Sequence, residues 1–375
     1  MKKHKPIKII GILLGSILAV VLIVAGILLL MLNGRIKNLQ QLDEEGYLYY
    51  AEYEGEYDNP LISAPCRLIQ NSGCSAFLAK EEDGRIFTGR NYDLSHADSE
   101  GNPSGLNVVL RLNPKGKYRS INVADAAWIT YLGLPYYKGA LSDDKVTKLP
   151  LAFLPYLCMD GINEKGLSVS ILALDVKEGE RAVSQNVKGK KKILYEELLR
   201  ILLDECASVD EAVNKAEEYN ISNILGRDYH LFVSDADGKS VVLEWRYEEL
   251  QVTYTDAATN FYVGFDDADA SYQKELSKAQ SEKEISPAYR FGYGHGYDRF
   301  LTIAEGLEKH RGEEGTAVMD KEELRLLLEQ TTQAFHPEEL TSLTQYHALY
   351  CNTDRTLEIY PCPSYDQKFT FSLEK

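Results

Sequence analysis

Residues 73–93 read Gly-Cys-Ser-Ala-Phe-Leu-Ala-Lys, then Glu-Glu-Asp-Gly, then Arg-Ile-Phe-Thr-Gly-Arg-Asn-Tyr-Asp. Two apolar-rich runs flank the dipeptide Asp83-Gly84, which is a strong signal for a tight turn between antiparallel strands. Such a hairpin returns Arg90 and Asp93 to the start of the first strand, beside Cys74. The stretch therefore predicts that a thiol, a guanidinium and a carboxylate meet at one end of a sheet. Spacing alone favours a plainer interpretation, a buried inert cysteine and a surface ion pair, because free cysteines are usually buried.

The composition limits the class of protein. A chain of 375 residues with 44% hydrophobic residues can bury one large core or two ordinary ones. The net charge of −16 argues against nucleic acid as a partner, because phosphate binding requires a basic surface. The sequence has no zinc-ligand spacing, no Walker loop and no dinucleotide fingerprint, so we expect no metal and no cofactor. The cysteines show no framework pattern, which leaves disulfide pairing open: Cys66, Cys74, Cys158, Cys206, Cys351 and Cys362.

The N-terminus carries a basic tail, residues 1–8, followed by an uncharged apolar run over residues 9–32. As a helix this run is about 36 Å long, enough to span a bilayer, whereas a signal peptide has a shorter apolar core and a cleavage site. Lysines are more frequent before the run than basic residues after it. This predicts a cytoplasmic tail, a transmembrane anchor and a single-pass protein of the cell membrane, with its main domain on the extracytoplasmic side. Residues 33–73 follow as a juxtamembrane leader, expected to be a helix or stalk and then an extended segment.

Residues 74–375 contain no linker rich in proline or serine and predict one domain. Strand signals dominate its first part, a helical leucine stripe follows, and strand signals return near the C-terminus. We expect strands or hairpins at 106–112, 120–123, 167–174, 230–245 and 345–360, and helices at 193–205, from Ser208 onward and at 320–333. This order indicates an α+β fold in which helices cover sheets in layers.

Several blocks recur in the same order in a known family. Asp-Gly-Ile-Asn-Glu-Lys-Gly-Leu at 160–167 is nearly identical to a motif of that family, and Gly-Arg-Asn-x-Asp at 89–93 stands at its distance from the cysteine. Further matches lie at 234–244, 259–260, 298–300 and 343–346. The chain therefore resembles the choloylglycine hydrolase, or linear amide C–N hydrolase, family. These are cysteine-type N-terminal-nucleophile (Ntn) hydrolases, with penicillin V acylase, bile salt hydrolase and acid-ceramidase-like relatives. The resemblance implies a four-layer αββα Ntn-hydrolase sandwich, preceded here by the transmembrane helix.

The resemblance also implies a catalytic role for each matched side chain. Cys74 would be the nucleophile and, as the first residue of the mature chain, would use its own α-amine as the base. Arg90 would favour the thiolate, and Asp93 would orient the amine. Asn260 would donate to the oxyanion, and Arg299 would hold the network electrostatically. No histidine is required, so His96 and His295 are interpreted as ordinary loop residues.

Two features depart from the family pattern. Bile-salt-type members carry an asparagine where this chain has Ala173, so Ala173 is an oxyanion candidate only through its backbone N–H. Cys74 also lies behind a long leader, and exposing its amine requires self-cleavage of the Gly73–Cys74 bond by attack of the thiol on the preceding carbonyl. That cut would release the domain from its anchor unless the leader stays packed against it. Ala173 and the unusual sequence of residues 106–134 weaken bile salts as the substrate, but not amide cleavage.

The expected function is hydrolysis of a linear, non-peptide C–N amide bond in a small N-acyl amide. Two alternatives stay open on the sequence: an acyltransferase of the penicillin-biosynthetic type, and a catalytically silent, membrane-anchored binding protein with the same fold. The expected partners are the small-molecule substrate and the membrane, through residues 9–32. Assembly into a homo-oligomer is open.

Overall fold

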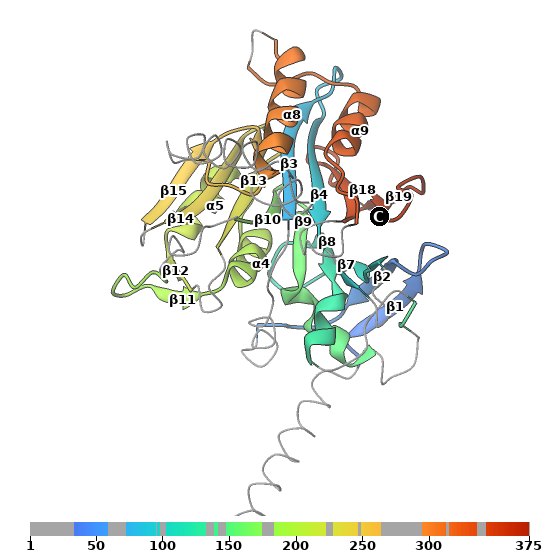
Figure 1. The fold of residues 1–375 in the computed structure, drawn as a ribbon. Helices are drawn as coiled ribbons and strands as arrows, with labels where there is room; N and C mark the ends of the chain where they lie inside the picture. The colour runs from blue at the N-terminus through green and yellow to red at the C-terminus, as the bar shows by residue number, and fades with distance from the viewer. Residues whose placement is uncertain are drawn as a thin grey trace, which may run out of the picture.

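The computed structural model describes residues 34–58, 73–94, 96–97, 103–132, 139–141, 148–174, 184–222, 228–246, 249–263, 295–312, 315–335 and 343–374 (Figure 1). Two large sheets dominate these parts. The strands of the nine-stranded sheet lie in the order β1 (Ile36–Gln41), β2 (Leu48–Tyr53), β7 (Asn107–Leu112), β8 (Ser120–Asp125), β9 (Cys158–Asn163), β10 (Ser168–Ala173), β13 (Tyr229–Ser234), β14 (Ser240–Arg246) and β15 (Glu249–Tyr254). The strands of the six-stranded sheet lie in the order β16 (Ala257–Ala258), β3 (Gly73–Lys80), β4 (Ile86–Asp93), β17 (Thr344–Cys351), β18 (Thr356–Pro361) and β19 (Phe369–Ser372).

Short pairs and helices complete the described fold. The short pairs are β5 (His96–Ala97) with β6 (Pro103–Ser104), and β11 (Lys191–Ile193) with β12 (Tyr219–Ile221). The helices are α4 (Tyr195–Glu205), α5 (Val209–Ala216), α8 (His295–Lys309) and α9 (Lys321–Gln330), with 3-10 helices η2 (Ala126–Leu132) and η3 (Pro150–Tyr156). Neighbouring strands pair antiparallel except β2 with β7 and β11 with β12, which are parallel.

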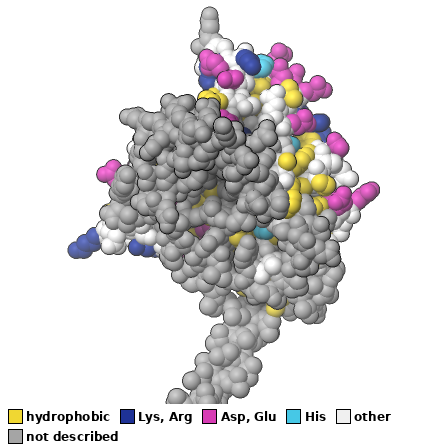
Figure 2. Space-filling model, in the orientation of Figure 1, with side chains coloured by type: hydrophobic (Ala, Val, Ile, Leu, Met, Phe, Trp, Pro, Cys, Tyr) yellow, Lys and Arg dark blue, Asp and Glu magenta, His cyan; other side chains and the backbone are white. Residues whose placement is uncertain are grey.

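The elements form four layers. Helices α4 and α5 contact β9, β10, β13 and β14 of the nine-stranded sheet, and α8 and α9 contact β3, β4, β16 and β17 of the six-stranded sheet. Strand β3 contacts β10, so the two sheets face each other between the helical layers (Figure 1). Figure 2 shows Asp and Glu side chains around the end of the molecule that carries α8 and α9, consistent with the acidic composition.

The three predicted helices are present as α4, α5 and α9, although α9 ends at Gln330 rather than at 333, and α8 was not predicted. The leucine stripe of α4 is buried, because its members recur every three or four residues and share one face: Leu198, Leu199, Leu202 and Leu203. Ser208 caps α5 by accepting a hydrogen bond from the Glu211 N–H, and Asp320 caps α9 in the same way through Glu323. The predicted hairpins at 230–245 and 345–360 are confirmed as β13–β14 and β17–β18.

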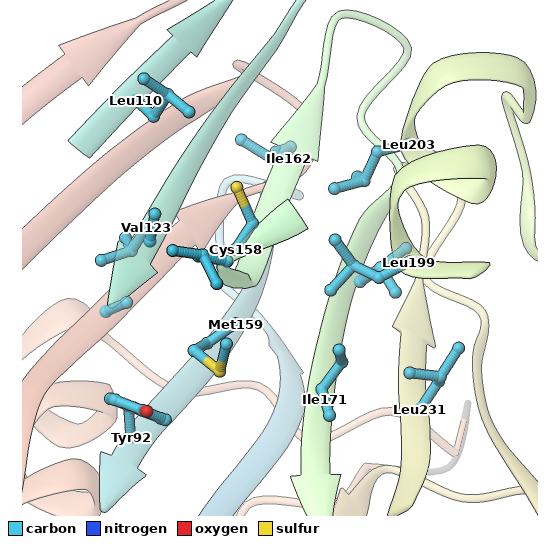
Figure 3. Packing of buried hydrophobic residues seen from close by; sticks show 14 of the residues in the cluster. Tyr92, Leu110, Val123, Cys158, Met159, Ile162, Ile171, Leu199, Leu203 and Leu231 are labelled. Atoms are coloured by element: carbon cyan, nitrogen blue, oxygen red, sulfur yellow. The ribbon is translucent and has the colours of Figure 1, made fainter. Parts of the chain in front are cut away.

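Two apolar cores separate the layers. The larger lies between the sheets and under α4; Figure 3 shows Leu199 of α4 near Ile171 and Leu231 of the sheet, and Leu203 at the level of Ile162. The smaller lies between the six-stranded sheet and helices α8 and α9. Side chains alternate along β3, so Cys74 joins the larger core whereas Phe77 joins the smaller one. Cys74 therefore faces the interface between the two sheets.

The expected helix or stalk before Cys74 is wrong for the residues that the structure describes. Residues 36–41 and 48–53 are the strands β1 and β2, and β2 pairs parallel with β7 in the nine-stranded sheet. Tyr57 follows them and is buried; its hydroxyl donates to Asp204 of α4 over 2.7 Å. This part of the leader is thus built into the same fold as the residues after Cys74.

The fold class and localisation expected from the sequence need correction. They included a membrane-spanning helix over 9–32, which lies outside the described residues. Within the described parts, no helix combines the length and the apolar character needed to cross a bilayer, because the helices are short, amphipathic and packed on the sheets. The described residues therefore form four layers of helices and sheets. The single-pass assignment to the cell membrane is not supported.

Candidate active site

The hairpin predicted from residues 73–93 is confirmed. Strands β3 and β4 pair antiparallel with Gly73 opposite Asp93, Cys74 opposite Tyr92 and Ala76 opposite Arg90. The turn is closed where the Arg85 N–H donates to Asp83 Oδ1 over 3.0 Å, while Gly84 adopts a φ of +92°. The hairpin register therefore returns Arg90 and Asp93 to the level of Cys74.

Arg90 and Cys74 meet at one backbone carbonyl. Arg90 is fully buried, and its Nη2 donates to the Ile171 carbonyl over 2.7 Å. Cys74 Sγ lies 3.5 Å from the same oxygen. Arg90 Nε donates to Asp160 Oδ2 over 3.0 Å, which forms an ion pair with no exposed side-chain area. The structure thus brings thiol and guanidinium together, as the hairpin predicts.

A second chain of contacts links Asp93 to the backbone of Cys74. Arg299 of α8 donates from Nη1 to Asp93 Oδ2 and from Nη2 to Asn260 Oδ1, both over 2.6 Å. Asn260 Oδ1 also accepts the Cys74 N–H over 2.9 Å. Two pairs that are far apart in sequence are therefore in direct contact: Cys74 with Asn260, 186 positions away, and Asp93 with Arg299, 206 positions away. All of these residues are at most 4% exposed.

Ala173 lies next to Asn260 at the edge of β10. Asn260 Nδ2 donates to the Ala173 carbonyl over 2.6 Å. The next residue, Leu174, directs its N–H the other way, to the Asp228 carbonyl over 2.8 Å. Because backbone groups alternate along a strand, the N–H of Ala173 points to the same side as its carbonyl, toward Asn260. The predicted oxyanion candidates therefore share one side of the site with Cys74.

Burial dominates the ionisation of the two central groups. Burial raises the pKa of the Cys74 thiol above its ordinary value; the Arg90 guanidinium opposes this effect, and Asp93 adds to it. Burial alone would lower the pKa of Arg90, but Cys74 and Asp160 outweigh it and raise that pKa. In this uncut chain, with Cys74 in peptide linkage to Gly73, the protonated thiol is favoured beside a permanently charged guanidinium.

Sequence reasoning missed several partners of these groups. Asp93 Oδ1 accepts from Thr344 Oγ1 over 2.6 Å, and Asp93 Oδ2 accepts from Gln333 Nε2 over 2.8 Å. Asp160 and Tyr346 also contact the Arg90 side of the site. Three of the four stand inside blocks that match the family, namely 160–167 and 343–346. The signal was therefore available, but it did not say which group each residue contacts.

The two histidines interpreted as loop residues both lie in regular elements. His96 is in β5, and its Nε2 is 2.7 Å from Asp125 Oδ2, which also accepts from the Tyr92 hydroxyl over 2.7 Å. His295 is the first residue of α8. In the described parts of the chain, no group of three or more His, Cys, Asp or Glu side chains is arranged to hold a metal ion.

A second buried histidine supports the segment that carries Asn260. His230 Nε2 is 2.7 Å from the Thr259 carbonyl, so it must carry the donated proton, and Nδ1 is 2.8 Å from Glu244 Oε1. Glu244 Oε1 also accepts from the Val263 N–H over 2.8 Å. The pair therefore fixes the backbone on both sides of Asn260. Glu244 ends a block that matches the family, but its role was not predicted.

Comparisons with known proteins match the chain to one family. Residues 74–262, just over half of the chain, match the family described as "Linear amide C-N hydrolases, choloylglycine hydrolase family". The bile salt hydrolase/transferase of Clostridium perfringens (strain 13 / Type A) is 25% identical over 185 residues, which cover 48% of this chain and 50% of the relative. The chain therefore spans about half the length of that curated relative.

Solved structures share the fold. A mutant of the conjugated bile acid hydrolase of Clostridium perfringens aligns with a TM-score of 0.52 and 18% identity, covering 80% of this chain and 92% of that one. Penicillin V acylase of Agrobacterium tumefaciens aligns with a TM-score of 0.51 and 16% identity, covering 80% and 87%. Identities this low speak for the fold, and the family assignment rests on the match that begins at Cys74. The chain belongs to the choloylglycine hydrolase family of linear amide C–N hydrolases.

Proposed function

We propose that this chain is an amidase that cleaves the linear C–N bond of a small N-acyl amide with Cys74 as the nucleophile. The family consists of linear amide hydrolases, which supports the reaction class. The nucleophile and the substrate class are the finer part of the proposal. They are supported by the convergence of a thiol, a guanidinium and an amide side chain at one buried position.

One observation carries the proposal: Asn260 Oδ1 accepts the backbone N–H of Cys74 and is itself held by Arg299. A cut between Gly73 and Cys74 turns that peptide nitrogen into an α-amine without moving its partner. An α-amine has a reference pKa of about 7.7–8.0 and exchanges protons near neutrality. The geometry thus suits a base that is created in place beside the thiol.

The reaction follows from these groups. The amine takes the proton from the Cys74 thiol, and the thiolate attacks the acyl carbon to form a C–S bond. The tetrahedral oxyanion accepts hydrogen bonds from the Ala173 N–H and from Asn260, whose amide has a second hydrogen besides the one given to the Ala173 carbonyl. The C–N bond breaks and the leaving amine takes the proton from the α-ammonium. Water, deprotonated by the same α-amine, then hydrolyses the thioester and releases the acid.

Arg90 and Asp93 support this cycle in different ways. Arg90 stabilises the thiolate, because a guanidinium beside the sulfur offsets part of the cost of burying a negative charge. Asp93, held by Arg299, Gln333 and Thr344, lies opposite Gly73 and accepts a hydrogen bond from the new α-ammonium, which orients it. No cofactor is required for any step.

Self-cleavage supplies the amine in this proposal. Attack of the Cys74 thiol on the Gly73 carbonyl forms a thioester and frees the α-amine, and water then hydrolyses the thioester to release the leader. Glycine before the cysteine suits this step because it leaves the carbonyl unshielded. The match to the family begins at Cys74, which supports a mature chain with that start.

The substrate is proposed only by class. The curated relative is named a bile salt hydrolase/transferase, and one structural neighbour is a penicillin V acylase. Ala173 replaces an asparagine of the bile-salt pattern, so we propose a simple N-acyl amide rather than a bile salt. The relative's name also makes acyl transfer to an added amine an outcome to be measured.

Two measurements test the proposal. The mass of the purified chain should reveal a new N-terminus at Cys74, and Cys74→Ser should slow both the cut and the release of amine from N-acyl amides and penicillin V. Cys206→Ser, at another buried thiol outside the site, is the matched control and should keep both. A fully active intact chain would contradict self-cleavage, and full activity of Cys74→Ser would remove Cys74 from the mechanism. Product analysis with added glycine separates hydrolysis from acyl transfer.

A further inference from the structure

The Arg90 guanidinium rests on a buried carboxylate that is itself bound by two tyrosines. Asp160 has no exposed area and accepts Arg90 Nε on Oδ2 over 3.0 Å. Tyr346 donates its hydroxyl to the same oxygen over 2.6 Å, and Tyr350 donates to Oδ1. All three donors to Asp160 are fully buried. The carboxylate is thus shared among a cation and two hydroxyl groups.

The strand register explains how the tyrosines reach this position. Strand β17 pairs with β4 so that Ala348 lies opposite Arg90 and Tyr346 lies opposite Tyr92. Tyr346, Ala348 and Tyr350 alternate onto one face of β17. The small side chain of Ala348 leaves room for Arg90 between the two rings, and Asp160 reaches them from β9 of the facing sheet.

These contacts govern how much of the Arg90 charge reaches Cys74. A carboxylate bonded to Arg90 alone would neutralise most of the guanidinium charge in this buried place. Each hydroxyl that donates to the carboxylate spreads its negative charge and weakens that neutralisation. On its other side Arg90 is fixed by the Ile171 carbonyl, which Cys74 Sγ also contacts. The Ile171 carbonyl therefore fixes the distance between the guanidinium and the sulfur, while Asp160 on the opposite side of Arg90 determines how much of the guanidinium charge is neutralised.

We infer that Tyr346 and Tyr350 are positioning residues that, by donating to Asp160, keep the Arg90 guanidinium aimed at Cys74 and its charge available to the thiolate. The inference rests on the proposed role of Cys74 as nucleophile. Each tyrosine acts through Asp160 and Arg90 rather than on the sulfur itself. Tyr346 stands in the block 343–346, whereas Tyr350 lies beyond it.

Other polar groups surround the same thiol and belong in the comparison. From β4 they are Arg90, Tyr92 and Asp93; from β9, Asp160; from α8, Arg299; from the segment after β16, Asn260; and from β17, the two tyrosines. Strand β10 contributes backbone carbonyls at Ile171 and Ala173. The tyrosine substitutions leave the charges of all of these groups in place, so a change in Cys74 ionisation reports on the carboxylate behind Arg90.

The test is the pH dependence of Cys74 alkylation by iodoacetamide, followed by mass spectrometry of the Cys74-containing peptide. Tyr346→Phe and Tyr350→Phe should each move the alkylation midpoint to higher pH by about one pH unit, which is about tenfold slower alkylation at a fixed lower pH. The double variant should move it further. Tyr360→Phe is the matched control. Like the two tyrosines, Tyr360 lies in the six-stranded sheet and donates its hydroxyl to a carboxylate, but this carboxylate is Glu358, away from the site.

Asp160→Asn should have the opposite effect. It therefore distinguishes an effect of charge on Cys74 from a loss of packing around Arg90. It removes the negative charge behind Arg90, so the alkylation midpoint should fall in the folded fraction of that variant. Unchanged midpoints in folded Tyr346→Phe and Tyr350→Phe would overturn the inference, as would a wild-type Cys74 that stays unalkylated at every pH. Should the chain prove inactive on amides while the midpoints shift as stated, the proposed function fails and the tyrosine–carboxylate effect stands.

Discussion

Arg299→Met should destabilise the fold strongly, because Arg299 joins Asp93 to Asn260. The guanidinium makes two hydrogen bonds of 2.6 Å, one to each partner, and the residue is 4% exposed. Methionine keeps the length and the apolar stem of the side chain but removes the charge and both donors. The substitution therefore leaves a buried carboxylate without its cation.

The expected cost can be estimated from these contacts. Removing one partner of a buried ion pair costs about 3–5 kcal/mol, because the remaining charge stays buried. Asp93 keeps hydrogen bonds from Gln333 and Thr344, which places the expectation at the lower end, about 3 kcal/mol. Domains of this kind have stabilities of about 5–15 kcal/mol, so the variant should still fold. The folded variant should also hydrolyse amides more slowly than the wild type, because Asn260 loses its hydrogen bond from Arg299.

A double-mutant cycle makes this reasoning testable. Asp93→Asn combined with Arg299→Met removes both charges, so the double variant should be less destabilised than the two single effects added together, by about 1–3 kcal/mol. Urea unfolding followed by circular dichroism measures all four free energies of unfolding. Arg325→Met on α9 is the control, because its partner Glu329 is exposed and such pairs contribute at most about 1 kcal/mol. Additive effects within about 0.5 kcal/mol, or a loss of less than about 1 kcal/mol for Arg299→Met, would refute the buried pair.

Three further outcomes follow from buried groups. Burial raises the pKa of Glu196 from 4.5 to about 7. The stability that its neutral form contributes is therefore fully present below pH 4.5 and is lost as the pH rises through 7. In urea unfolding, Glu196→Gln should be about 2–3 kcal/mol more stable than the wild type at pH 8 and equally stable at pH 4. Burial lowers the pKa of His347 to about 3, so the stability that its neutral form contributes is fully present above pH 6.5 and is lost as the pH falls toward 3. His347→Asn should therefore make the loss of stability at acid pH less steep. An equally steep loss would exclude His347 as its cause. A chain cut at Gly73–Cys74 should elute as one species in size-exclusion chromatography. Tyr57→Phe removes the hydrogen bond to Asp204, so its two fragments should separate at a lower urea concentration. Wild-type fragments that separate without urea would contradict this expectation.

Local features of the site were predictable from the sequence, and the reason is physical. The β3–β4 hairpin is specified by its own turn residues, Asp83 and Gly84, so Cys74, Arg90 and Asp93 meet through short-range pairing. The N-caps of α5 and α9 are likewise set within four residues. Neither feature depends on how the two sheets pack.

Long-range partners were not predictable in the same way. Asn260 and Arg299 lie 186 and 206 positions from their partners, and only the resemblance to the family pointed to them. Asp160 reaches Arg90 from the facing sheet, a contact that no periodicity encodes. The strands β1 and β2 were missed because β2 pairs parallel with β7, more than fifty positions away. Buried side chains recur at 49, 51 and 53, but the sequence of β2, Leu-Tyr-Tyr-Ala-Glu-Tyr, does not alternate apolar with polar residues. Such a strand lacks the clean alternation that sequence patterns detect.

The position of β1 and β2 bears on what a cut at Gly73 could do. Strands β1 and β2, before the cut, form the edge of the nine-stranded sheet, whereas the cut falls after Gly73, the first residue of β3 in the six-stranded sheet. Cleavage therefore shortens β3 by one residue and removes no strand from either sheet. Tyr49, Tyr53 and Tyr57 are buried, and an aromatic side chain that buries about 150–250 Å² contributes about 4–6 kcal/mol of apolar burial before the entropy of ordering is subtracted. Tyr57 and Asp204 add a buried hydrogen bond across the cut. Cleavage would therefore change the chemistry of one nitrogen while leaving its surroundings, including the Asn260 acceptor, in the uncut geometry.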